Sequence, residues 1–139
     1  MSNAKSSFGT VLSIGNGGTA EIFIPIGEVG NIKGPTLALA TEDVTNHDSP
    51  DAFEEFIGTT ANGGEVSFPV NLVAADAGQL ACEQALIDKT IKNFTIEFPD
   101  GTGKAFAALV TKFDRGGPVK GKLSADITLK VTGKPADLP

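Results

Sequence analysis

The clearest pattern along the chain is the alternation of apolar and polar residues that marks half-buried β-strands. It is most regular in Leu123–Thr132 and recurs in Gly64–Val73 and Lys92–Pro99. Shorter runs typical of strands lie at 8–14, 20–26, 29–33, 36–41 and 104–113. The apolar positions expected to face a core in the three regular strands are Val66, Phe68, Val70, Leu72, Phe94, Ile96, Phe98, Leu123, Ala125, Ile127, Leu129 and Val131. The pattern therefore predicts about eight strands.

One helix is expected, over Ala77–Lys89. Asp76 stands where it can cap the first amides, and Gln79 lies three residues later, where its side chain can reach back. Glycine-rich turns at 15–18, 100–103 and 115–118 separate the strands. We therefore expect a mainly β fold, an antiparallel β-sandwich or flattened barrel with one flanking α-helix and a long inter-strand loop. The whole chain, 1–139, is expected to form a single domain, with flexible ends at 1–7 and 134–139.

The long loop is the segment Thr41–Gly64, which lies between two predicted strands. Loops of roughly twenty residues are uncommon in compact domains and are usually functional or disordered. Phe53, Phe56 and Ile57 argue against disorder because disordered segments are poor in aromatic and large apolar residues. Two interpretations stay open. The segment is an arm that buries these side chains against another protein, or it is a lid over the domain's own core.

Composition narrows the function classes. The formal net charge of −6 argues against capture of nucleic acid and against binding to anionic membranes, since both need clustered Lys and Arg. All aromatic residues are Phe, so no Trp or Tyr ring is present to stack on sugars or bases. No apolar run approaches membrane-spanning length, and the N-terminus lacks the apolar stretch of a signal peptide. We expect a protein made in a reducing cytoplasm.

No catalytic or cofactor-binding set emerges from the sequence. His47 is the single histidine, which leaves at most one imidazole for catalysis or for a metal site with Asp43, Asp48 and Asp51. A lone histidine in an acidic loop is more often a hydrogen-bonding surface residue. The run 101–104 resembles part of a phosphate loop but lacks its flanking residues, so it is a turn. Cys82, the single cysteine, lies in the helix's apolar sector and is expected to be buried.

Three blocks of sequence, in order, resemble the major tail protein, or tail tube protein, of long-tailed bacteriophages. The first block comprises FGTVLSIGNG (8–17) and IGEVGNIKGP (26–35). The second comprises DVTNHDSP (43–50), EFIG (55–58) and GEVSF (64–68). The third comprises FTIEFPDG (94–101), KLSA (122–125) and ITLKVTGKP (127–135). The resemblance covers nearly the whole chain.

This resemblance implies a structural virion protein that self-assembles into stacked hexameric rings around a hollow tube for DNA. The implied partners are other copies of the chain, tail tip (initiator) and terminator proteins, and, in the lumen without specific binding, the tape measure protein and genomic DNA. The implied location is the virion, or the host cytoplasm during assembly. No membrane, metal, cofactor or enzymatic activity is implied. The expected subunit-interface residues of the assembly loop are Asp43, Thr45, His47, Asp48, Phe53, Glu55, Phe56 and Ile57.

Two alternatives stay open at this stage. The same fold could serve as a tube or ring subunit of a contractile injection or type VI secretion system. A monomeric β-sandwich that binds a protein or glycan is the other, although the absence of Trp and Tyr argues against glycans.

Overall fold

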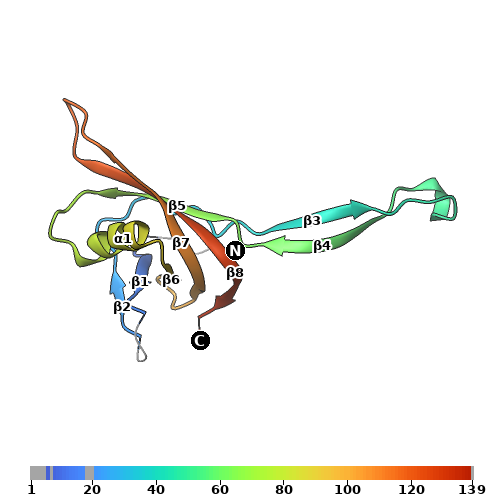
Figure 1. Cartoon of the computed structure of the whole chain (residues 1–139), viewed down its shortest axis with the longest axis horizontal. Helices are drawn as coiled ribbons and strands as arrows, with labels where there is room; N and C mark the ends of the chain where they lie inside the picture. The colour runs from blue at the N-terminus through green and yellow to red at the C-terminus, as the bar shows by residue number, and fades with distance from the viewer. Residues whose placement is uncertain (1–5, 7, 18–20, 139) are drawn as a thin grey trace.

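The computed structural model describes residues 6, 8–17 and 21–138 (Figure 1). Within them, the strands are β1 (Val11–Gly15), β2 (Phe23–Pro25), β3 (Ala38–Asp43), β4 (Phe56–Asn62), β5 (Glu65–Asn71), β6 (Ile91–Glu97), β7 (Gly103–Gly116) and β8 (Ser124–Asp137). The helical elements of this part of the chain are α1 (Ala77–Asp88) and the 3-10 turn η1 (Pro50–Ala52). The predicted class, mainly β with one flanking α-helix, is confirmed.

Six strands form one antiparallel sheet in the order β2-β1-β6-β7-β8-β5. The hairpin of β7 and β8 is its longest part, with 14 residues in each strand. Their register shifts twice, between Ala105 and Ala107 and between Val110 and Lys112. Such irregularities bend a strand and increase its twist. The sheet can therefore curl around a core although it carries only one layer of strands.

The segment 29–33 brings the two ends of this sheet together. It follows β2 at one edge and runs alongside β5 at the other, with isolated bridges from Val29 to Val70 and from Lys33 to Ser67. The backbone amides of Lys33 and Ser67 each donate to the other's carbonyl at 2.9 Å. The predicted strand at 29–33 is thus a pair of bridges rather than a full strand. Its pairing gives the body the outline of a flattened barrel.

The core follows the predicted alternation closely. Its buried residues include Val66, Phe68, Val70, Phe94, Ile96, Ala125, Ile127, Leu129 and Val131. Two predicted core residues are wrong. Phe98 is 41% exposed because β6 ends at Glu97 and Phe98 instead closes a turn, its amide donating to the Thr102 carbonyl at 2.7 Å. Leu123 is 65% exposed because it precedes β8.

Helix α1 packs on the sheet and begins with a buried polar network. Asp76 caps the helix as predicted, accepting from the amide of Gln79 at 2.9 Å, and it also accepts from the amide of Gly27 at 3.0 Å. The prediction that the Gln79 side chain reaches back to the start of the helix is wrong. It accepts from the Val73 amide at 3.0 Å and donates to the Gly27 and Asn71 carbonyls at 2.9 Å each. Gln79 therefore joins three chain segments.

The C-terminal end also differs from the prediction. Residues 134–137 were expected to be flexible, but β8 continues through Asp137 because β7 supplies paired positions opposite it, such as Lys104. Residues 1–5 and 7, in the other predicted flexible end, lie outside the described residues, as do 18–20 and 139. Within the described chain, no helix combines the length and the apolar character needed to cross a membrane.

Candidate assembly surface

The second sheet of the structure is a two-stranded hairpin that stands away from the body, drawn at the right of Figure 1. We call residues 38–62 the arm and residues 44–55 its tip. All residues of β3 and β4 are exposed, and within the described residues the arm strands pair only with each other. The interpretation of this segment as a lid over the domain's own core is therefore wrong.

The arm is built more regularly than the sequence suggested. Much of the expected loop at 41–64 is strand, since β3 ends at Asp43 and β4 occupies Phe56–Asn62, leaving the tip between them. The ladder runs from Ala38 opposite Asn62 to Asp43 opposite Phe56, with one bulge. Backbone pairing across this ladder satisfies the polar groups of a segment that has no core to contact.

Large apolar side chains are exposed on both faces of the arm. Phe56 and Ile57 are 55% and 51% exposed, and as neighbours in a strand they point to opposite faces. Leu39, in the partner strand, is 61% exposed. Exposed apolar surface of this kind usually marks an interaction site. A partner that buries one face of the arm therefore leaves an apolar side chain exposed on the other.

Short hydrogen bonds hold the tip in one shape. The Thr45 hydroxyl accepts from the Glu55 amide at 2.8 Å, and the Thr45 amide donates to the Asp43 carboxylate at 2.8 Å. The Ser49 hydroxyl donates to the Glu55 carboxylate at 3.0 Å and accepts from the Asn46 amide at 3.0 Å. Hydrogen bonds from the side chain and then the backbone of Thr45 hold the pKa of Asp43 below its usual value. The tip is thus preformed rather than loose.

The eight predicted interface residues all lie on the arm, but they do different things. Asp43, Thr45 and Glu55 come together in the hydrogen bonds that shape the tip, and Glu55 is half-buried there. Phe53 follows η1 and is 73% exposed. His47 is exposed, like Asp48, whose amide donates to Asn46. Phe56 and Ile57 belong to β4. Ser49, which sequence reasoning missed, completes the tip.

The metal site considered around His47 is not formed in the structure. Among the described residues, no three His, Cys, Asp or Glu side chains lie close enough together to hold a metal ion. The acidic groups of the tip are instead spread along its turns.

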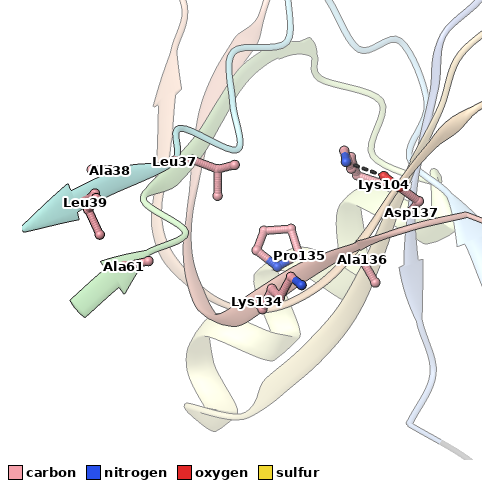
Figure 2. Close-up of a pocket in the computed structure, with 9 residues that line it drawn as sticks. All are labelled: Leu37, Ala38, Leu39, Ala61, Lys104, Lys134, Pro135, Ala136 and Asp137. Carbon is pink, nitrogen blue, oxygen red and sulfur yellow. Dashed lines mark hydrogen bonds and ion pairs between the residues drawn. The ribbon is translucent and has the colours of Figure 1, made fainter. Parts of the chain in front are cut away.

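A groove of about 700 Å³ lies where the arm meets the body (Figure 2). Its apolar wall is formed by Leu37, Leu39, Ala61, Pro135 and Ala136. Lys104, Lys134 and Asp137 line its polar part, where Lys104 forms an ion pair with Asp137. Sequence reasoning missed this groove because it placed Pro135 and Ala136 in a flexible end. The available signal was the pair of leucines, Leu37 and Leu39, in a strand without a matching core face.

The fold is shared with chains of several solved particle structures. The tail of an empty gene transfer agent (GTA) particle, refined with C6 symmetry, has a TM-score of 0.82 at 19% identity, over 98% of this chain and 100% of that chain. The native GTA virion gives 0.79 at 17%, over 98% and 100%. The anti-feeding prophage baseplate gives 0.72 at 13%, over 99% and 97%. A comparison with curated proteins found no match.

These likenesses show that the chain shares its fold with chains of the GTA and anti-feeding prophage particles. At the level of sequence, the model of the lambda phage tail tube protein family matches residues 9–137. The chain belongs to the lambda phage tail tube protein family, and it is a structural component of a phage-type tail.

Proposed function

We propose that six copies of this chain form a ring and that rings stack through their arms into the hollow tube of a tail. The observation that carries the proposal is the arm itself, a preformed hairpin with exposed apolar side chains on both faces. A two-stranded hairpin is marginally stable alone, so burial of the arm against neighbouring copies would offset its exposure. The C6 symmetry of the similar GTA tail supports the sixfold ring.

The eight arm residues predicted from the sequence enter this proposal in two groups. Phe53, Phe56 and Ile57 supply apolar contacts with other copies, and Asp43, Thr45 and Glu55 keep the tip in shape. His47 and Asp48 are exposed in the tip and face the neighbouring subunit. Tail tip and terminator proteins start and end the stack, which is assembled in the host cytoplasm.

In the assembled tube, the lumen holds the tape measure protein and later lets genomic DNA pass. The net charge of −6 supports passage without specific binding, because like charges repel the DNA phosphates. No catalytic activity forms part of the proposal. The tube of a contractile injection system shares the fold, but the family match favours the phage tail.

The test is to replace the tip and keep the rest of the arm. Asp43 and Phe56 are opposite each other in the ladder, so residues 44–55 can be replaced by Asn-Gly, which favours a two-residue hairpin turn. We expect this variant to keep the thermal stability of the body but to form no tubes in electron micrographs. Purified tail-tip complexes are added to both proteins, since a tail subunit can need an initiator. Tubes of normal length from the variant would refute the role of the tip.

A matched pair of single substitutions tests the arm strands. Ile57 in the arm and Ile87 on α1 are exposed to similar extents, 51% and 59%. We expect Ile57→Ser to reduce tube formation and Ile87→Ser to leave it unchanged. Equal effects of the two substitutions would mean that general surface hydrophobicity, and not the arm, drives association.

A further inference from the structure

The groove at the base of the arm has the form of a binding site without an occupant from its own chain. Its wall is apolar, and Leu37 in that wall is 70% exposed (Figure 2). The tip of the same arm lies at the far end of the hairpin (Figure 1), separated from the groove by the length of β4. Seven residues of strand span about 23 Å. The tip therefore cannot fold back into its own groove.

The groove also carries net positive charge. Lys104 is paired with Asp137, whose pKa is lowered first by the hydrogen bond and the charge of Lys104 and, to a smaller extent, by the charge of Lys134. Within the described chain, no carboxylate lies within ion-pair distance of Lys134. An occupant of this groove should therefore combine an apolar side chain with negative charge.

The tip of the arm has both of these properties. Phe53 is 73% exposed and lies between Asp51 and Glu54 in the sequence. From Asp43 to Glu55 the chain has five carboxylates and no Lys or Arg. Because hydrogen bonds already fix the shape of the tip, presenting Phe53 to a partner costs little conformational entropy.

We propose that the groove at the base of each arm binds the tip of an arm from a second copy of the chain. Phe53 of that copy lies against the apolar wall, and its Asp51 and Glu54 lie near Lys134 and Lys104. The inference rests on the proposed tube function and adds the docking site for the tip. Tip and groove are different surfaces, so the contact is heterologous and can repeat from copy to copy without limit. A growing tube needs such a contact.

Disulfide trapping between two singly substituted chains tests the contact directly. Ala52→Cys places a thiol beside Phe53 without removing the ring, and Ala136→Cys places one in the groove. The native Cys82 gives little background because it is buried and burial raises its thiol pKa to about 12. The matched control is Ala74→Cys, which lies in another groove beside α1. The variants are mixed, assembled with tail-tip complexes and oxidised with copper phenanthroline.

We expect a cross-linked dimer from Ala52→Cys with Ala136→Cys, at least tenfold more abundant than from Ala52→Cys with Ala74→Cys. Tubes without this cross-link, or with a stronger link to Ala74→Cys, would overturn the docking site and leave the proposed function standing. If the parental chain forms no tubes even with tail-tip complexes, the proposed function and the docking site both fall.

Charge reversal gives an independent measurement of the same contact. Lys134→Glu and Glu54→Lys should each raise the protein concentration needed for assembly by about tenfold, because each places like charges together. Combining both substitutions in one chain restores an opposite-charge pair. The protein concentration needed for assembly should then return to within about threefold of the parental value. A combined variant no better than the single variants would contradict the pairing of tip and groove.

Discussion

Replacing Gln79 by Ala should strongly destabilise the body of this protein. The side chain is 2% exposed and forms three hydrogen bonds, all to backbone groups. Its loss leaves the amide of Val73 and the carbonyls of Gly27 and Asn71 without these partners. The three residues are half-buried, so water can reach them in part. At about 1 kcal/mol for each group, the expected loss in free energy of unfolding is about 3 kcal/mol.

Gln84 provides the control on the same helix. Its side chain is exposed and donates only to Asp88, at 2.9 Å. Gln84→Ala makes the same chemical change and should cost less than about 0.5 kcal/mol. Gln79→Glu is a third variant, which keeps the acceptor for Val73 but loses both donors. It should destabilise the protein at pH 7, where its carboxylate would face two carbonyl oxygens.

Unfolding in urea followed by far-UV circular dichroism is the suitable assay, because the chain has no Trp or Tyr for fluorescence. The measurement uses unassembled protein, since association with other copies would raise the apparent stability. In thermal unfolding, the Gln79→Ala midpoint should fall by about 10 °C. If the free energies of unfolding of Gln79→Ala and Gln84→Ala differ by less than about 0.5 kcal/mol, the hydrogen bonds of Gln79 do not hold these segments together.

Three further predictions concern single positions. Burial raises the pKa of the Cys82 thiol to about 12, so a thiol reagent at pH 8 should label Cys82 only after unfolding. The contribution of the neutral thiol to the free energy of unfolding is fully present below about pH 9, where the thiol of the unfolded chain is also neutral. This contribution is lost as the pH rises toward 12. Lys89 has a φ of 58°, so Lys89→Gly should raise the free energy of unfolding by about 0.5–1 kcal/mol in urea titrations, whereas an unchanged or lower value would contradict the strain. Gly64→Ala should destabilise the base of the arm more than Gly101→Ala destabilises its turn. Both glycines have positive φ, but only a Cβ at Gly64 would clash with a carbonyl, that of Thr36. Amide hydrogen exchange in the arm measures the difference, and equal exchange in both variants would refute it.

The sequence pattern predicted the body well because each strand there has one buried face. Phe68 and Ile127, for example, are 2% and 0% exposed, and the residues on either side of each are less buried. The start of the helix was predictable because it depends on a local cap at Asp76. Contacts between residues that are distant in the sequence were harder to predict. The partners of Gln79 come from two places in the chain, Gly27 and the segment 71–73, and helix-capping rules do not point to either of them.

The arm could be located from the sequence but its strands could not. Phe56 and Ile57 indicated a surface in need of a partner, yet their adjacency gave no alternating pattern for β4. Alternation reports one buried and one solvated face, and neither face of the arm is buried in the single chain. The groove was missed because its wall combines residues that are far apart in the sequence. Leu37 precedes the arm, and Pro135 lies in the segment expected to be a flexible tail. Both failures concern surfaces that the single chain leaves exposed.

The negative charge of the tip opposes non-specific association between exposed apolar arms. Arms with exposed Phe and Ile side chains could associate with each other at random, as exposed strand edges do. Five carboxylates between Asp43 and Glu55 make two tips repel at short range, whereas the groove with Lys134 attracts a tip. The same charges therefore oppose the symmetric contact, which would stop at a dimer, and favour the heterologous contact, which can continue. Raising the salt concentration should weaken both effects, so assembly at high salt should yield more irregular aggregates and fewer tubes.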